Sequence, residues 1–243
     1  MQRFTILPLF HNLLNSLKCD IAKNYHTLQN RLFLQHCKTF FKSYSESALK
    51  CWNCGTVRTT DALLCTQCNL LQKPHDTSNY FAVLNVEQTF DIDPKSLTNK
   101  YRQLQAVLHP DKYSNKSQAE RDISLTYSSL VNNAYNTLQV PLKRAIHLLK
   151  LYGVNIDQEV THPEFLTLIM ELNEEVEAAK TPEDLKNLDR KNKTEMEKIN
   201  STLSSCFKQQ KLRQVKDEII KMKYYNSIRM RINELLRDRG IVE

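Results

Sequence analysis

Four of the seven cysteines stand in two closely spaced pairs whose side chains could bind one metal ion. The pairs are Cys51 with Cys54 and Cys65 with Cys68, and ten residues separate them. Two thiolates in one tight turn can reach the same ion, and four thiolates form the tetrahedral ligand set that zinc prefers. Because the chain supplies all four ligands, we predict a closed, structural site for one zinc ion. Redox-active thiols are the alternative, but two matched pairs favour a metal.

The segment around these cysteines is too short to bury a core of its own. Gly55 directly follows the first pair and gives the backbone the freedom that a tight turn requires. Binding of a structural zinc ion is worth on the order of 10 kcal/mol and would supply the folding free energy of the segment. The remaining cysteines have no comparable spacing, and we interpret Cys19, Cys37 and Cys206 as unpaired thiols.

A second group of chemically distinctive residues is the tripeptide His109-Pro110-Asp111. The proline restricts the shape of the loop, the aspartate can pair with an arginine of a partner, and the histidine offers a ring nitrogen. Adjacent residues on either side of a proline would not easily converge on one substrate atom. The pattern therefore favours a loop that contacts a partner over an acid–base pair that does chemistry.

The elements on either side of this tripeptide are predicted to be helices. A helix begins at Asp93-Pro94, where an N-cap precedes a proline in the first turn, and it ends near Leu108, because Pro110 disfavours helical geometry at His109. Its opposite face is basic and carries Lys95 and Arg102. Its apolar stripe is formed by Leu97, Tyr101, Leu104 and Leu108.

A second helix follows a polar loop that extends from Lys112 to Ser117. Its apolar face contains Tyr127, Val131, Ala134 and Leu138. Two consecutive amphipathic helices with a short connection predict an antiparallel pair with the loop at its tip. A short apolar run, residues 80–84, precedes the pair and is also expected to be helical.

The carboxy-terminal part of the chain is predicted to form a bundle of three long helices. After a short helix from Pro141 to Gly153, the long helices begin near Thr161, at Thr181-Pro182 and near Gln209. The second is expected to end near Cys206 and the third near Arg237. Helices with such short joints form an up-down-up bundle, so the fold class is all-α.

The first of these long helices has more apolar residues than one core-facing stripe requires. The stripe consists of Phe165, Ile169, Leu172 and Val176. Leu166 and Met170 lie about 100–140° away around the helix. Acidic residues surround them at positions 171, 174 and 177. Periodicity alone favours a protein-docking patch and a wide buried stripe equally.

Composition and charge exclude several classes of protein. The 243 residues contain three glycines, so the clustered glycines of a P-loop or a dinucleotide-binding fold are absent. The formal net charge is +7, and no run of eighteen apolar residues indicates a membrane span. Residues 1–45 contain six basic side chains and one acid. Such a basic, amphipathic leader is typical of a mitochondrial targeting sequence, with a basic tail as the alternative.

The central segment resembles a J domain. The resemblance rests on Tyr80-Phe81-x-x-Leu84, Lys100-Tyr101-Arg102, His109-Pro110-Asp111-Lys112 and Ala134-Tyr135-x-x-Leu138. In that family the His-Pro-Asp loop docks on a 70-kDa heat-shock chaperone and stimulates its ATPase. The resemblance thus implies a trigger at His109, Pro110 and Asp111. It also implies docking charges at Lys95, Arg102 and Lys112.

The combination of four cysteines, J domain and helical tail resembles the HscB-type iron–sulfur co-chaperones of eukaryotes, over residues 48–238. The resemblance implies that the tail binds an iron–sulfur scaffold protein through Leu166, Met170, Glu171, Glu174 and an aromatic residue, Tyr224 or its neighbour Tyr225. Thr167 departs from the pattern, because bacterial relatives tend to have an apolar residue there. The implied domains are a leader at 1–47, a zinc domain at 48–74, a J domain at 75–152 and the scaffold-binding bundle at 153–243.

These inferences lead to one functional hypothesis. The chain is expected to be a co-chaperone without enzymatic activity that delivers the cluster scaffold to a 70-kDa heat-shock chaperone in the mitochondrial matrix. A cytosolic pool, contacts with cluster acceptor proteins and a homodimer are left open. No nucleic acid partner is expected. The alternatives are a general J-domain co-chaperone, a zinc-containing nucleic-acid-binding protein and, third, a redox enzyme that uses the cysteines.

Overall fold

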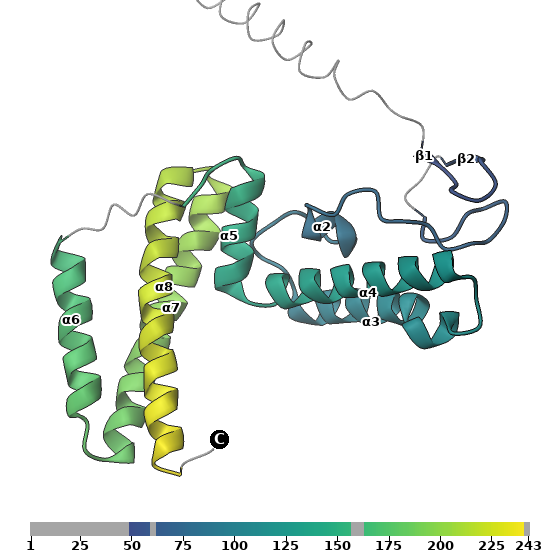
Figure 1. Ribbon diagram of the computed structural model, residues 1–243. Helices are drawn as coiled ribbons and strands as arrows, with labels where there is room; N and C mark the ends of the chain where they lie inside the picture. The colour runs from purple at the N-terminus through teal and green to yellow at the C-terminus, as the bar shows by residue number, and fades with distance from the viewer. Residues whose placement is uncertain (1–48, 59–61, 157–162, 241–243) are drawn as a thin grey trace, which may run out of the picture. The chain divides into compact units, whose positions relative to one another are not determined.

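The computed structural model describes residues 49–58, 62–156 and 163–240, and these residues are mostly helical (Figure 1). The predicted all-α class is confirmed. The predicted targeting leader, at residues 1–47, lies outside the described residues, as does the expected helix start at Thr161. Among the described residues, no helix combines the length and the apolar character that crossing a membrane would require.

The amino-terminal part contains two tight turns framed by very short β-structure. Strand β1 (Leu49–Lys50) pairs with β2 (Val57–Arg58) in an antiparallel ladder, with Lys50 opposite Val57. An isolated bridge between Leu64 and Leu71 frames the second turn. Two-residue strands carry no detectable alternation of apolar and polar residues, so the sequence analysis did not anticipate them.

The central helices begin where the sequence predicts them. Helix α2 (Tyr80–Val83) is capped by the side chain of Asn79, and α3 (Pro94–Leu108) is capped by Asp93, whose carboxylate accepts hydrogen bonds from two first-turn amides. Helix α3 ends at Leu108, before the His-Pro-Asp tripeptide, as predicted. Helix α4 (Gln118–Leu138) begins after Ser117.

The segment after α3 differs from the prediction. Pro110–Tyr113 forms a 3₁₀ helix, η1, whereas the sequence analysis placed Lys112 and Tyr113 in an irregular polar loop. The imidazole of His109 accepts a hydrogen bond from the backbone N–H of Asp111 and so caps this short helix. A cap of this kind depends on the rotamer of one histidine and leaves no periodic signal in the sequence.

Helices α3 and α4 form the predicted pair, and polar side chains join them. Figure 1 shows the two helices side by side with η1 at one end of the pair. Gln105 donates hydrogen bonds to Asn132 at 2.7 Å and to the backbone carbonyl of Ser128 at 3.1 Å. The rings of Tyr101 and Tyr135 stack with their centroids 4.2 Å apart. These contacts fix the position of one helix along the other and therefore the position of the loop that connects them.

The carboxy-terminal helices are α5 (Pro141–Leu151), α6 (Pro163–Ala178), α7 (Pro182–Lys208) and α8 (Leu212–Asp238). Thr181 and Asp184 form a reciprocal capping box at the start of α7, where an N-cap was predicted. Helix α7 extends two residues beyond the predicted end at Cys206. Helix α8 begins after the predicted Gln209, because Gln210 has a positive φ of 54° and interrupts the helical path.

Helices α7 and α8 pack along each other, while α6 and α5 also pack against α8. The side chains between α7 and α8 form the core, which includes Leu185, Leu203, Val215, Ile219, Met222 and Ile232. Helix α6 joins α8 through the T-shaped contact between Phe165 and Tyr224 and through an ion pair between Glu177 and Arg231. The three helices α6, α7 and α8 form the predicted up-down-up arrangement (Figure 1).

Candidate functional sites

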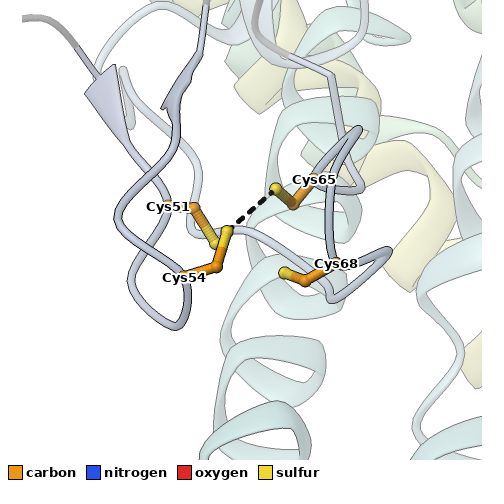
Figure 2. A group of neighbouring side chains, drawn as sticks. All are labelled: Cys51, Cys54, Cys65 and Cys68. Atoms are coloured by element: carbon orange, nitrogen blue, oxygen red, sulfur yellow. Dashed lines mark hydrogen bonds between the residues drawn. The ribbon is translucent and has the colours of Figure 1, made fainter.

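The four predicted metal ligands come together in one cluster. The Sγ atoms of Cys51, Cys54, Cys65 and Cys68 all lie within 4.8 Å of one another. Figure 2 shows the four side chains pointing toward a common centre from two turns of the chain. Cys51 and Cys65, the first cysteine of each turn, are buried, and none of the four forms a disulfide.

The two turns that carry these cysteines have the same backbone geometry. In each turn the first cysteine donates its N–H to the carbonyl five residues later, and its own carbonyl accepts from the N–H four residues later. That fourth residue is Gly55 in the first turn and Asn69 in the second, and both have a positive φ, at 72° and 56°. Left-handed geometry suits glycine and is tolerated by asparagine. The repeated geometry directs both pairs of thiols to one point.

The dimensions of the cluster fit a tetrahedral thiolate site. Zinc binds sulfur at about 2.3 Å, so the sulfur atoms of a regular tetrahedral site lie about 3.8 Å apart. The Sγ atoms of Cys54 and Cys65 are 3.7 Å apart. Soft thiolate ligands select zinc or iron over magnesium and calcium. The four cysteines are therefore positioned to bind a metal ion, and the ligand set is consistent with zinc.

Trp52, the single tryptophan of the chain, lies beside this cluster. Its indole N–H donates a 2.7 Å hydrogen bond to the carbonyl of Leu71, which ties the first turn to the segment that follows the second. The Leu71 side chain is fully buried, whereas Trp52 is 38 % exposed. Little apolar surface is buried around the cysteines, so the bound metal would be the main source of order in this part of the chain.

The tripeptide His109-Pro110-Asp111, called the tip below, lies on the surface at the end of the α3–α4 pair. His109 and Asp111 are both exposed, with 56 % and 90 % of their side chains accessible, and His109 Nδ1 lies 3.5 Å from Asp111 Oδ2. The two groups face solvent. Their position suits contact with a partner better than catalysis.

Three side chains donate hydrogen bonds to carbonyls in the last turn of α3, two of them from η1 and one from α4. Lys112 Nζ donates to the carbonyl of Ala106, Tyr113 OH donates to that of Val107 at 3.2 Å, and Ser124 Oγ donates to that of Leu108 at 2.7 Å. These carbonyls lie at a helix end, where no amide of the next turn is available. The tip is thus held in one shape by the end of the helix that precedes it.

The sequence analysis named Lys112 only as a docking charge and did not identify Tyr113 or Ser124 as part of the site. The burial of Tyr113 raises the pKa of its phenol, so the hydroxyl remains a hydrogen-bond donor at neutral pH. A tyrosine four residues after His109 is a weak signal in a sequence. The other predicted docking charges, Lys95 and Arg102, are exposed on α3.

The predicted scaffold-binding residues lie on the outside of α6. Leu166 is 37 % exposed and Met170 is 64 % exposed, while Ile169, on the core-facing stripe, is buried. Glu171 and Glu174 are exposed as well. Of the two interpretations that periodicity left open, the exposed apolar pair is what the structure shows. The wide buried stripe is not formed, because α6 packs mainly against α8.

Tyr224 and Tyr225 differ in accessibility. Tyr225 is 6 % exposed, and burial raises the pKa of its phenol. Tyr224 is half-buried and contacts the edge of Phe165, with ring centroids 5.7 Å apart. Tyr224 is therefore the aromatic residue that a partner bound to α6 could reach.

An ion pair holds α6 in place beside these residues. Arg231 donates two hydrogen bonds to the carboxylate of Glu177, at 2.6 and 3.0 Å. These bonds lower the pKa of Glu177 below its ordinary value and raise the pKa of the arginine. Two parallel hydrogen bonds define the orientation of both side chains and so limit rotation of α6 on α8.

Two known domains match the chain at these sites. The DnaJ domain matches residues 79–147, and the domain described as the HSCB C-terminal oligomerisation domain matches residues 161–233. The first match contains the His-Pro-Asp tip, and the second contains the exposed residues of α6 and Tyr224. The chain thus contains a J domain and a second, helical domain of a defined type.

Known proteins are similar to this chain in sequence and in fold. The chain is 36 % identical to the human iron-sulfur cluster co-chaperone protein HscB, over 75 % of this chain and 80 % of the relative. It is also 36 % identical to the homolog from Arabidopsis thaliana, over 74 % and 72 %. The crystal structure of human HscB matches with a TM-score of 0.73 and 35 % identity, over 78 % of this chain and 98 % of that one. The chain belongs to the HscB family of iron–sulfur cluster co-chaperones, which confirms the resemblance.

Proposed function

We propose that this protein delivers an iron–sulfur scaffold protein to a 70-kDa heat-shock chaperone and stimulates the ATPase of that chaperone. The observation that carries the proposal is the exposed His109-Pro110-Asp111 tip, held rigidly by the end of α3. The energy comes from the ATP of the partner, and this chain only triggers its hydrolysis.

The tip acts as a preformed docking element. Asp111 pairs with an arginine of the chaperone, while Pro110 and the contacts of Tyr113 keep the loop in its binding shape. Lys95 and Arg102, on the exposed face of α3, attract an acidic surface of the chaperone and increase the association rate. Because the loop is already ordered, little conformational entropy is lost on binding.

The scaffold binds to the outer face of α6. Leu166 and Met170 provide the apolar contact, Glu171 and Glu174 add negative charge that selects a basic surface, and Tyr224 extends the contact onto α8. Exposed apolar residues surrounded by charge are typical of a protein interface. The proposed scaffold site and the tip lie on different helices, so both partners can be held at once.

The remaining assignments are part of the same proposal. The proposed domains are those of the sequence analysis: a leader at 1–47, a zinc domain at 48–74, a J domain at 75–152 and a scaffold-binding bundle at 153–243. Cys51, Cys54, Cys65 and Cys68 hold one structural zinc ion, which orders the segment that contains them. The protein acts in the mitochondrial matrix, consistent with the basic leader.

The trigger is tested by single-turnover ATP hydrolysis on a mitochondrial 70-kDa heat-shock chaperone, with and without this protein. The wild-type chain is expected to accelerate hydrolysis at least tenfold, and a His109→Gln variant is expected to have no effect. A Lys116→Gln variant, which changes an exposed side chain in the same connection, is the matched control and should stimulate like the wild type. Equal stimulation by the His109→Gln variant would exclude the proposed trigger.

A further inference from the structure

Helix α6 has a second apolar flank, which the proposed scaffold site does not use. Leu168 is 43 % exposed and lies two positions from both Leu166 and Met170. Two positions correspond to about 160° around a helix, so Leu168 lies on the other side of the core-facing stripe. The proposed scaffold contacts therefore leave this leucine uncovered.

Leu168 lines a groove between α6, α7 and α8. The groove has a volume of about 510 Å³, and its apolar walls include Leu168, Leu172, Leu188 and Ile228. It arises because α6 packs against α8, which leaves the flank of α6 that faces α7 partly open. Binding sites in proteins are commonly apolar hollows of this size with a few polar groups.

One buried amide at this groove forms hydrogen bonds through its nitrogen but not through its oxygen. Asn192 lines the groove and is 5 % exposed. Its Nδ2 donates to the carbonyl of Tyr225 at 3.1 Å, which fixes the orientation of the amide, while its Oδ1 has no hydrogen-bond partner among the described residues. A buried acceptor without a hydrogen-bond partner lowers the stability of the fold.

The charge beside the groove favours a basic ligand. Helix α6 contains five glutamates and no lysine or arginine. Glu177 pairs with Arg231, whereas Glu175, which the proposed scaffold site does not use, has no ion pair within the described part of the chain. On the α7 side, the charges of Lys191 and Glu195 offset each other. A second copy of α6 would bring acid against acid, so self-association through this flank is disfavoured.

We infer that this groove binds a basic amphipathic helix of a partner protein. Aliphatic side chains of that helix pack on Leu168, Leu172 and Leu188, and its lysines or arginines face Glu175 on α6. A helix placed in a groove between helices is a recurrent mode of recognition. The inference goes beyond the proposed function, because the groove lies on the flank of α6 away from Leu166 and Met170.

The inference is tested with the full chain and a fluorescein-labelled helical peptide of eighteen residues made of leucine and lysine. Binding is measured by fluorescence anisotropy. Leu168→Glu is expected to weaken binding at least about tenfold, because a buried leucine contributes that much or more. The matched control is Leu125→Glu on α4, where the leucine is 54 % exposed and lies outside the groove. That variant should bind like the wild type.

Charge and self-association are tested in the same assay. Glu175→Gln is expected to weaken binding of the peptide at least twofold. The matched control is Glu87→Gln, an exposed position between α2 and α3, which should weaken binding by less than twofold. A peptide with glutamate in place of lysine should bind at least tenfold more weakly than the lysine peptide. Equal affinity of Leu168→Glu and wild type, or equal binding of the two peptides, would overturn the inference. So would sedimentation equilibrium in which the wild type is a dimer and Leu168→Glu a monomer.

The test is separate from that of the proposed function. Leu168 is not among the residues assigned to the scaffold or to the chaperone, so Leu168→Glu should retain full stimulation of the ATPase with and without scaffold. The milder Leu168→Ala variant should show an intermediate loss of peptide affinity. If Leu168→Ala binds the peptide like the wild type, the leucine is not part of the site.

Discussion

Removal of the metal is expected to unfold the four-cysteine segment and leave the helices intact. The tight turns at Gly55 and Asn69, the two-residue strands and the indole bond to Leu71 all depend on the convergence of four thiols. Without the ion, the four thiolates would repel one another or take up protons. The helices bury many apolar side chains besides Leu71, so we expect them to stay folded without this segment.

The free energies of burial, metal binding and chain ordering show how much the segment depends on a metal. Besides the cysteines, the segment buries one large apolar side chain, that of Leu71, which is worth about 1.5–3 kcal/mol. Binding of structural zinc is worth on the order of 10 kcal/mol. Ordering each residue costs about 1–2 kcal/mol, so burial of one leucine offsets the ordering of only one or two residues. We therefore expect this segment to fold only with a bound metal.

The folding of this segment can be followed by intrinsic tryptophan fluorescence. Trp52 is the single tryptophan, and it lies between two of the cysteines. We expect a zinc chelator to shift tryptophan emission to longer wavelength and to release one equivalent of metal, while the helical circular dichroism signal at 222 nm changes by less than a tenth. A Cys65→Ser variant should show the emission of the chelated protein from the start, and Cys206→Ser should behave like the wild type.

Two results would refute this reasoning. Unchanged tryptophan emission after complete loss of metal would mean that the segment is ordered by other contacts. A simultaneous loss of the helical signal would mean that the helices depend on the metal.

Three further predictions concern local contacts. Burial and the nearby Lys150 lower the pKa of His147, whose Nε2 accepts the N–H of Tyr80 at 3.1 Å. The unfolded chain therefore binds the proton more readily, and the free energy of unfolding should fall as the pH drops below about 6.5. Urea titrations at several pH values should show a smaller pH dependence of this free energy in His147→Gln than in the wild type. In Gly55→Ala there is space for the added methyl group, but the positive φ at this position is strained for alanine. Metal affinity, measured by a competition titration, should therefore fall about tenfold, whereas Asn69→Gly should leave it unchanged. Ser124→Ala leaves the buried Leu108 carbonyl without its side-chain donor and should cost about 1–3 kcal/mol in chemical denaturation.

The sequence predicted the elements whose signals are local. Asp93-Pro94 marked the start of α3, Pro110 marked its end, and Thr181-Pro182 marked the start of α7, because caps and prolines act within a few residues. The spacing of the cysteines likewise predicted their convergence. Each of these features can be recognised before any long-range contact is known.

Features that depend on distant contacts could not be predicted. The exposure of Leu168 results from the position of α7, and the difference between Tyr224 and Tyr225 results from the rotation of α8 against α6. Helical periodicity shows that residues share a face but not which neighbour covers that face. The role of Asn69 as the counterpart of Gly55 was missed because asparagine in a loop usually has ordinary backbone geometry.

The central claim is that one molecule couples the scaffold to ATP hydrolysis by the chaperone. It is tested most directly by single-turnover hydrolysis on a mitochondrial 70-kDa heat-shock chaperone with and without scaffold protein, for the wild type, His109→Gln, Met170→Ala and the control Leu125→Ala. The account predicts that scaffold increases the stimulation by the wild type and the control. It predicts that Met170→Ala loses only this increase and that His109→Gln loses all stimulation. Stimulation by the wild type that is indifferent to scaffold would instead indicate a general J-domain co-chaperone and contradict the account.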